Sequence, residues 1–477
     1  MVNLLNYNKI FLFLILAMVF MACKSIDSKI DKAFQNGEFA KAEELIEHEI
    51  QTSEKDSIRI AELQYRLELI SRLRIEFSLS ENEVKEKLGK YHTHVADSML
   101  VWEQSGDLEM RRIDGEKRYF NRAVSNFFRI NKWAKALKDS LDGKRFDDVE
   151  SFRSKYLTSI FSSKNNLSAG PFDENVLTIN YSIRLKANTV PDGAKVYCWM
   201  PFPRKNQVRL KEIELLSLSE PNYILAPEET LQRSIYMEKN AVKDSATEFL
   251  VSYRIHTEAQ WCNVKAEDAL SYNVESELYK KYTNESLPHI VFSDSIKALS
   301  HKIVGNETNP VEQVRLLYYW LNDNIPWAGA LEYSVMECIP EYVLKNRRGD
   351  CGMQTFLFLS MARSLGIPCK WQSGWYLMPE EKNLHDWAEV YYEGIGWVPV
   401  DVSFKLFDSD DPRIREFYMN GLDSYRLIIN DDVAREFYPV KKYLRSEPYD
   451  FQRGELEWDG GNIYFDKWTY QMEVAYN

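Results

Sequence analysis

The stretch Arg348-Gly349-Asp350-Cys351-Gly352-Met353-Gln354-Thr355 joins a charged, glycine-containing turn to an apolar run that ends at Gly366-Ile367-Pro368. This pattern predicts a loop that leads into a helix, which stops where a Gly and a Pro follow. Cys351 then lies at or next to the helix N-terminus. The partial positive charge of a helix N-terminus favours a thiolate over a thiol, so this position suits a nucleophile.

A His and an Asp follow downstream in strand-like surroundings. His385 stands in Leu384-His385-Asp386-Trp387-Ala388-Glu389-Val390, and Asp401 ends Gly396-Trp397-Val398-Pro399-Val400-Asp401. Strands are predicted at 369–377, 386–393 and 397–402, and Gly394 gives a hairpin signal between the last two. One helix that carries the Cys, packed on strands that carry the His and the Asp, is the layout of papain-like folds.

Cys, His and Asp in this order are the parts of a thiol acyl-transfer site, provided that the fold brings them together. Cys351 would be the nucleophile. His385 would act as base toward the thiol and then as acid toward the leaving amine. Asp386 is nearer to His385 in sequence, but neighbouring residues of a strand point to opposite faces, which favours Asp401 as the residue that orients the imidazole.

The three motifs resemble the transglutaminase-like core, and specifically bacterial lipoproteins that carry such a domain. The intervals 385 − 351 = 34 and 401 − 385 = 16 are similar to that core, whereas roughly 130 residues separate Cys from His in papain-type enzymes. The resemblance covers roughly residues 290–405. Members of this family include transglutaminases, peptidases, peptide:N-glycanase relatives and inactive domains, so the resemblance implies the fold more strongly than the reaction.

Three tryptophans are candidates for contacting the substrate or the oxyanion near the nucleophile. The backbone N–H of Cys351 is the first donor expected for a tetrahedral oxyanion. In family relatives a Trp indole is the second donor, and the resemblance makes Trp327 the candidate here. Trp371 and Trp375 stand four apart, on one face of a predicted strand, and we expect them to line the substrate cleft.

Changes of hydrophobic period divide the chain into regions and predict a multidomain α+β protein. Helical spacing predicts a helical domain over residues 23–165, which includes one hairpin of the tetratricopeptide type and a capping box at 80–83. Alternation of apolar and polar residues then predicts an antiparallel β-sandwich over residues 170–265. The papain-like, transglutaminase-like α+β catalytic domain is expected over residues 285–477.

The first 22 residues form a predicted signal peptide. An uncharged apolar run from Ile10 to Ala22 is too short for a membrane span and ends at Cys23. Met21-Ala22-Cys23 resembles a bacterial lipoprotein signal, in which Cys23 becomes the lipidated first residue. Ordinary secretion with an incidental Cys is the alternative. We therefore expect a lipoprotein anchored in the bacterial cell envelope, either periplasmic or on the cell surface.

The charge and the motif content of the sequence argue against some classes of partner and cofactor. The formal net charge is −12, which argues against nucleic acid as a partner. The sequence has no CxxC or HExxH pattern, so we predict no metal and no other cofactor. The remaining cysteines stand in apolar contexts and are expected to be small buried side chains, with pairing left open: Cys198, Cys262, Cys338 and Cys369. Nothing indicates the oligomeric state.

The sequence thus favours an envelope-anchored, cysteine-dependent acyl enzyme that attacks a peptide or side-chain amide through a thioester. Water as the second nucleophile would make it an amidase or peptidase, which we favour, and an amine would make it a transglutaminase. The contrasting hypothesis is a non-catalytic lipoprotein that binds a glycan or protein and keeps a relic triad. The natural substrate and the role of the helical region stay open.

Overall fold

The computed structural model describes residues 26–52, 57–143, 147–163, 170–205 and 207–477. It forms two compact units, Met1–Leu141 and Asp142–Asn477. The predicted signal peptide and Cys23 lie outside the described residues. No helix within the described ranges is both long and apolar enough to span a membrane.

The first unit is mainly helical, as predicted. A helix over residues 26–35 and α2 (Phe39–Thr52) form the expected hairpin, and Gly37 at the turn has φ +73°. The capping box is confirmed, since Ser80 and Glu83 bond each other's backbone N–H at the start of α4 (Glu81–Gly89). The other helices are α3 (Ser57–Glu76), α5 (Val95–Gln104), α6 (Ala123–Ile130) and α7 (Lys132–Asp142).

This unit also contains a small sheet that the sequence did not predict. Its strand order is β1-β3-β2, with β1 at Leu79–Ser80, β2 at Met110–Ile113 and β3 at Glu116–Tyr119. Strands of two to four residues are too short to show an alternating pattern. They were therefore not recognised within a region whose hydrophobic spacing is mostly helical.

The second unit contains the predicted sandwich, made of two five-stranded sheets. Alternation in β4 (Phe172–Leu185) places its apolar side chains in the sandwich core, where they are almost completely buried. One sheet has the order β13-β9-β4-β17, with β6 paired to β9, and the other has the order β16-β15-β5-β8-β7. The remaining strands are β5 (Lys195–Pro201), β6 (Leu210–Leu218), β7 (Tyr223–Leu225), β8 (Ser234–Asn240) and β9 (Thr247–Trp261).

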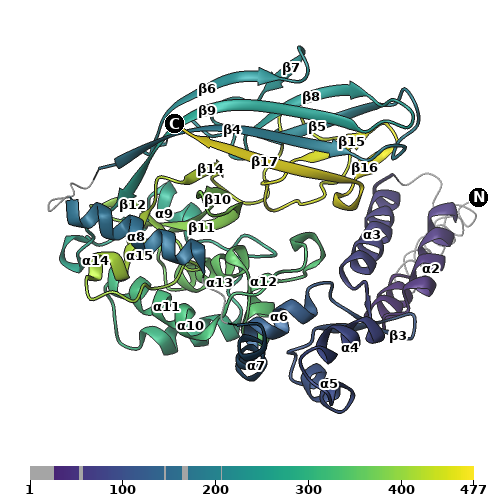
Figure 1. Ribbon diagram of the computed structural model, residues 1–477, viewed down its shortest axis with the longest axis horizontal. Coiled ribbons are helices and arrows are strands. Elements are labelled where there is room, and N and C mark those ends of the chain that lie inside the picture. Colours follow the sequence, from purple (N-terminus) through teal and green to yellow (C-terminus); the bar gives the residue numbers. More distant parts are fainter. Residues whose placement is uncertain (1–25, 53–56, 144–146, 164–169, 206) are drawn as a thin grey trace, which may run out of the picture. The chain divides into compact units, whose positions relative to one another are not determined.

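The C-terminal part of the chain returns to this sandwich. β17 (Trp468–Tyr476) pairs with β4 along its whole length, and β15 (Glu455–Trp458) pairs with β5; Figure 1 shows β17 in yellow beside β4. β16 (Gly461–Ile463) and β13 (Gly421–Leu422) extend the two sheets. Residues 285–477 therefore do not make a domain separate from 170–265, because the two segments share both sheets.

The central helix α13 (Cys351–Ser364) is buried along almost its whole length, from Gly352 to Arg363. A helix that is apolar on all sides needs partners on all sides. Helices α10 (Asp294–Val304), α11 (Pro310–Asn324) and α12 (Ile339–Asn346) pack against it, as do β10 and β11. Shorter elements complete this region, namely α9 (Glu277–Tyr282), α14 (Pro412–Arg415) and α15 (Phe417–Asn420), together with α8 (Asp148–Ser163).

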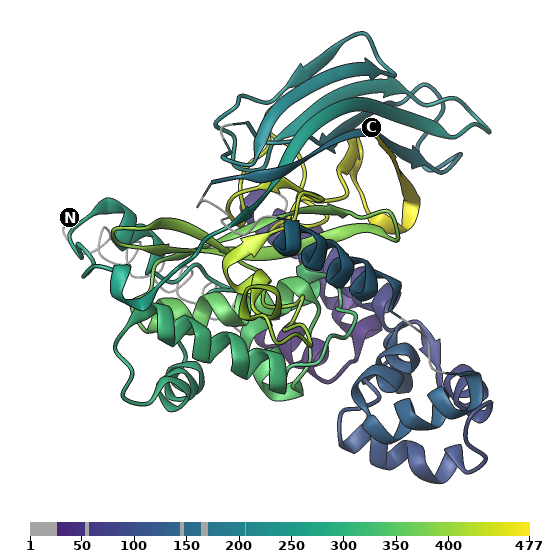
Figure 2. The same cartoon turned by 60° about the vertical axis from the view of Figure 1, so that its left-hand side comes forward.

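A four-stranded sheet lies between the helices and the sandwich (Figure 2). Its order is β12-β11-β10-β14, with β10 at Cys369–Leu377, β11 at Lys382–Tyr392, β12 at Gly396–Val400 and β14 at Arg426–Asn430. All nine residues of β10 are buried. Its first half packs in the core around α13, and Trp375 and Leu377 pack in the sandwich core. β10 therefore belongs to both cores.

Gly374, in the middle of β10, gives a test of this packing. A Cβ at Gly374 would lie 2.0 Å from the carbonyl oxygen of Leu427 on β14, so Gly374→Ala has to push the two strands apart. We expect a loss of about 1–3 kcal/mol in the free energy of unfolding, measured by urea denaturation. Gly170→Ala is the control, because its Cβ meets no atom within 4 Å. Equal stability of the two variants would contradict the close approach.

His289 gives a second test, through pH. It is 1% exposed, its Nδ1 accepts the N–H of Ile339, and burial lowers its pKa to about 3. Below the unfolded pKa of about 6.5 the unfolded chain binds a proton that the folded chain refuses, so this group makes stability fall as the pH drops from 6.5 toward 3.

For His289 alone, the free energy of unfolding should fall by about 1.4 kcal/mol per pH unit in this window. His289→Gln should flatten the pH dependence by that slope, measured by urea denaturation between pH 4.5 and 7.5. His301→Gln, which changes an exposed histidine on α10, should leave the slope unchanged. An identical slope in wild type and His289→Gln would exclude a neutral His289.

Candidate active site

Cys351 is the first residue of α13, as the sequence predicts. Asp350 is the N-cap, and its side chain accepts the N–H of Met353 at 3.0 Å. The preceding loop is held on two sides, since Gln354 Nε2 donates to the Gly349 carbonyl and Gly349 N–H donates to the Pro326 carbonyl. The thiol therefore projects from a fixed first turn.

Gly352 makes room beside the thiol. A Cβ on this residue would lie 2.1 Å from Tyr333 Oη and 2.6 Å from Asp386 Oδ2. Tyr333 belongs to a short 3-10 turn at Tyr333–Val335. The glycine next to Cys351 thus allows a hydroxyl and a carboxyl to reach the helix end at close range.

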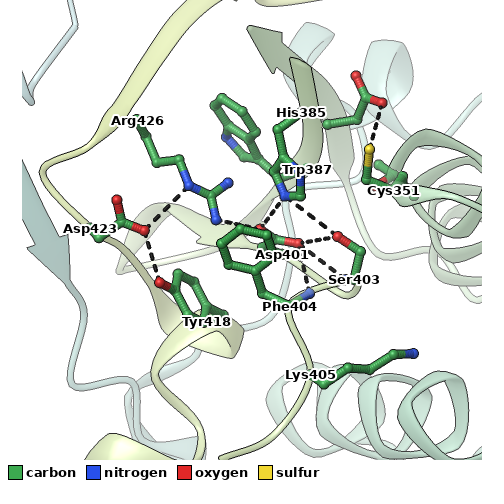
Figure 3. A network of polar contacts seen from close by, with 12 residues as sticks. Cys351, His385, Trp387, Asp401, Ser403, Phe404, Lys405, Tyr418, Asp423 and Arg426 are labelled. Carbon is green, nitrogen blue, oxygen red and sulfur yellow. Dashed lines mark hydrogen bonds and ion pairs between the residues drawn. The ribbon is translucent and has the colours of Figure 1, made fainter. Parts of the chain in front are cut away.

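His385 and Asp401 are brought together as predicted. His385 lies on β11, and Asp401 directly follows β12, which pairs with β11 through Ala388 and Val400. His385 Nε2 lies 2.7 Å from Asp401 Oδ2, and both side chains are buried; Figure 3 shows this pair beside Cys351. Because Nε2 of His385 is bonded to Asp401, the other ring nitrogen of His385, Nδ1, is available to a reaction partner.

Asp401 is fixed by four further contacts, which makes it the most constrained group of the site. Oδ1 accepts the N–H of Ser403, the Ser403 hydroxyl and the N–H of Phe404, while Oδ2 also accepts Arg426 Nη2 at 2.8 Å. Burial alone would raise the pKa of Asp401, but His385 and Arg426 outweigh it and hold that pKa well below its usual value. Asp401 is therefore a permanent carboxylate.

Arg426 comes from β14 and has no exposed side-chain surface. Its Nε donates to Asp423 Oδ2, and its guanidinium lies 4.1 Å from the centre of the Phe404 ring. Burial lowers the pKa of His385; Asp401 opposes this shift, and the positive charge of Arg426 adds to it. The imidazole is consequently neutral at rest.

Cys351 differs from the sequence-based expectation. Its Sγ lies 3.2 Å from Asp386 Oδ2 and makes its hydrogen bond there, and within the described ranges it shares none with His385. Burial is the main cause that raises the pKa of Cys351 well above its ordinary value, and the charge of Asp350 adds to it. The helix N-terminus was expected to favour a thiolate, but burial beside two carboxyl groups is the larger effect, so the resting thiol is protonated.

The tryptophan predictions had different outcomes. Trp327 is 39% exposed, and its backbone pairs with Gly349, so it stands beside the loop that precedes Cys351. Its role as an oxyanion donor stays a prediction. The expectation that Trp371 and Trp375 line a cleft is wrong, because both are fully buried. The ring centres of Trp371 and Phe356 lie 4.3 Å apart, and those of Trp375 and Tyr181 lie 4.8 Å apart. Because both faces of this strand are covered, its side chains pack in hydrophobic cores.

The four other predicted cysteines have free thiols. Cys198, Cys262 and Cys369 are buried, as expected for small apolar side chains, and Cys338 is partly exposed. Among the described residues no group of three His, Cys, Asp or Glu side chains is arranged to hold a metal.

Sequence reasoning missed Arg426, Ser403 and Gln452, which contact the triad, and Tyr333, which contacts Asp350 and Asp386 beside it. Arg426 carried a usable signal, since a charged residue that opens the apolar strand Leu427-Ile428-Ile429 must be paired if the strand is central. The other three come from turns with no periodic pattern, and only the folded chain places them at the site.

Comparison with known proteins agrees with this geometry. Residues 297–402, which include Cys351, His385 and Asp401, match the sequence model of the transglutaminase-like superfamily. The chain contains a transglutaminase-like domain. The papain-like α+β arrangement expected for this domain is therefore confirmed.

Several individual proteins are similar to parts of the chain. An uncharacterized protein of Haemophilus influenzae is 29% identical over 158 residues, which are 28% of this chain and 41% of that protein. The chain thus spans less than half the length of that relative. A solved structure described as a candidate cysteine protease of Cytophaga hutchinsonii has a TM-score of 0.43 and 14% identity, over 64% of this chain and 91% of that one. The periplasmic domain of TgpA from Pseudomonas aeruginosa has a TM-score of 0.24 and 12% identity, over 50% and 88%.

Arg426→Met tests the charge balance around Asp401 and His385. Removing one partner of a buried ion pair should lower the free energy of unfolding by about 3–5 kcal/mol. Because Arg426 lowers the pKa of His385, its loss should raise that pKa, measured by NMR titration of the imidazole. Arg415→Met, which removes a side chain that is 40% exposed, is the control. An unchanged His385 titration in Arg426→Met would contradict this role.

Proposed function

We propose that this protein is a cysteine-dependent acyl enzyme, in which Cys351 attacks a peptide or side-chain amide and forms a thioester. The observation that carries the proposal is the buried bond between His385 and Asp401 next to the thiol at the start of α13. A neutral imidazole held at Nε2 by a permanent carboxylate keeps Nδ1 ready to take a proton.

The first half of the reaction needs a small movement of the thiol. The S–H hydrogen of Cys351 turns toward His385 while Sγ keeps its contact with Asp386 Oδ2, and Sγ attacks the amide carbonyl carbon while the thiol proton passes to Nδ1. When the tetrahedral intermediate collapses, the C–N bond breaks and Nδ1–H protonates the leaving amine. Asp401 stabilises the imidazolium between these steps. The backbone N–H of Cys351, at the first position of α13, is the proposed first donor to the oxyanion, and Trp327 is the proposed second donor.

The second half releases the acyl group. A water molecule gives up its proton to the same imidazole as it attacks the thioester, and the thiol is restored. We favour this hydrolysis, as an amidase or peptidase would perform it. An amine in place of water would make the enzyme a transglutaminase by the same steps. The substrate in either case is a protein or peptide.

We further propose that the enzyme works in the bacterial cell envelope, held to the membrane by a lipid on Cys23. The support is the sequence of residues 1–23, with its short apolar run ending in Met21-Ala22-Cys23. The competing proposal, a binding lipoprotein with a relic triad, is disfavoured by the intact bond between His385 and Asp401, which a binding role does not need.

Turnover of a peptide library tests this function. The full-length chain in detergent is incubated with peptides and methylamine, and mass spectrometry scores both cleavage and methylamine incorporation. Cys351→Ala and His385→Ala should each reduce product formation by about 10²- to 10⁴-fold, because one removes the nucleophile and the other the proton carrier.

Cys338→Ala is the matched control, since it removes a partly exposed thiol on the N-terminal side of α12 and should leave turnover unchanged. Product formation that persists in Cys351→Ala would exclude the proposed chemistry. Absence of any acylated Cys351 peptide, together with absence of both products, would favour the binding lipoprotein.

A further inference from the structure

Asp386 is a buried carboxyl in direct contact with the proposed nucleophile. It lies on β11 next to His385, and its side chain is almost completely buried. Its two oxygens have different neighbours. Oδ1 faces Gln452 Nε2 at 2.7 Å, whereas Oδ2 faces Cys351 Sγ at 3.2 Å and Tyr333 Oη at 3.5 Å.

The contacts of Gln452 fix Oδ1 as an acceptor. Gln452 Nε2 also lies 2.8 Å from the His385 carbonyl and 3.2 Å from the Gly374 carbonyl. Backbone carbonyls only accept, so this end of the amide must be its NH2 group. An NH2 group that donates to Asp386 Oδ1 favours an oxygen without a proton there, because a carbonyl-type oxygen is the better acceptor of the two oxygens of a carboxylic acid. If the carboxyl carries a proton, that proton is on Oδ2.

The hydrogen of Tyr333 is already used elsewhere. Its hydroxyl donates to Asp350 Oδ1 at 2.8 Å, and the same oxygen accepts the N–H of Met353. A carboxylate at a helix N-cap is favoured in its charged form and is a strong acceptor, and its contact with the hydroxyl is the shorter of the two, so the hydrogen points to Asp350. Toward Asp386 Oδ2, which is the more distant neighbour at 3.5 Å, Tyr333 Oη can then offer only a lone pair.

Among the residues that the structure describes, Asp386 Oδ2 is therefore faced by a tyrosine oxygen that accepts and by a sulfur. A thiol is a weak donor, and a buried carboxylate oxygen supported by so little is unfavourable, so the proton belongs on Oδ2. Burial raises the pKa of Asp386 well above its usual value, and Asp450, Asp350 and Asp401 raise it further. Burial also raises the pKa of Asp450, but hydrogen bonds from Ser373 and Asn430 favour its carboxylate, so Asp386 is the group that takes up the proton.

We propose that Asp386 is a further catalytic residue, which acts as a neutral carboxylic acid and donates a hydrogen bond from Oδ2 to Cys351 Sγ. This inference rests on the proposed function of Cys351. The Asp386 proton stays on Asp386 throughout, and the thiol proton passes to His385 Nδ1. As negative charge develops on the sulfur, the donated hydrogen bond strengthens and lowers the barrier to forming the thiolate.

Alkylation of Cys351 by iodoacetamide tests this role without any substrate. The full-length chain is treated in detergent, and mass spectrometry gives the rate for the Cys351 peptide. Asp386→Asn keeps the shape of the side chain and places an NH2 donor where Oδ2 stands, so its rate at pH 7 should stay within about threefold of wild type. Asp386→Ala removes the donor and should lower the rate by about 10- to 100-fold, because hydrogen bonds to charged groups contribute about 1.5–3 kcal/mol.

The pH profile separates this role from a purely structural one. Above the pKa of Asp386 the carboxyl becomes an anion that disfavours the thiolate, so the wild-type alkylation rate should rise less steeply with pH at high pH. Asp386→Asn cannot ionise and should lack this flattening. Asp408→Asn, at an exposed position, is the control and should keep the wild-type profile. Circular dichroism and thermal melting check that each variant is folded.

Three outcomes would overturn the proposal. A rate in Asp386→Asn well above wild type would show that Asp386 is ionised and repels the thiolate. A rate in Asp386→Asn as low as in Asp386→Ala, or a folded Asp386→Ala as fast as wild type, would remove the donor role. Failure of the proposed function is seen separately, because peptide turnover then does not depend on Cys351, whatever Asp386 does to alkylation.

Discussion

The carboxylate of Asp401 is the constraint on which the site depends. It has no exposed surface, and a buried charge without partners would be strongly unfavourable. Five donors from three segments satisfy it: the imidazole on β11, the guanidinium on β14, and three groups of the turn 403–404. Its backbone carbonyl accepts the hydroxyl of Tyr318 on α11. The same charge therefore orients His385 and joins the sheet to the helical layer.

The site is assembled from segments that are far apart in the sequence. Cys351 comes from a helix end, His385 from a central strand and Arg426 from an edge strand. Gln452 comes from the segment that leads into sandwich strand β15. It nevertheless donates to the backbone carbonyl of His385 and to the side chain of Asp386. The sandwich and the catalytic layer are consequently one structure, and the C-terminal strands are part of the support of the nucleophile.

The sequence predicted the parts of the site that follow regular patterns. A capped helix start located Cys351, and strand alternation with the spacing of the motifs located His385 and Asp401. What it did not predict depends on long-range contacts. The protonated state of Cys351 is set mainly by burial where the helix end packs on β11. The burial of Trp371 and Trp375 is set by layers on both sides of β10. The predicted domain boundary at residue 265 was wrong because strands of the sandwich pair with strands that lie about 200 residues beyond that boundary. No local sequence pattern reveals such pairing.

One strand, β10, has side chains in both cores. Such an element cannot detach from one core without exposing apolar surface of the other, so the two cores should unfold as a single cooperative unit. By linkage, any molecule that binds at Cys351 in the folded state stabilises the sandwich as much as the helical layer. The β-sandwich contributes no side chain of the triad. Its stability against unfolding would nevertheless increase when a molecule is bound at the active site.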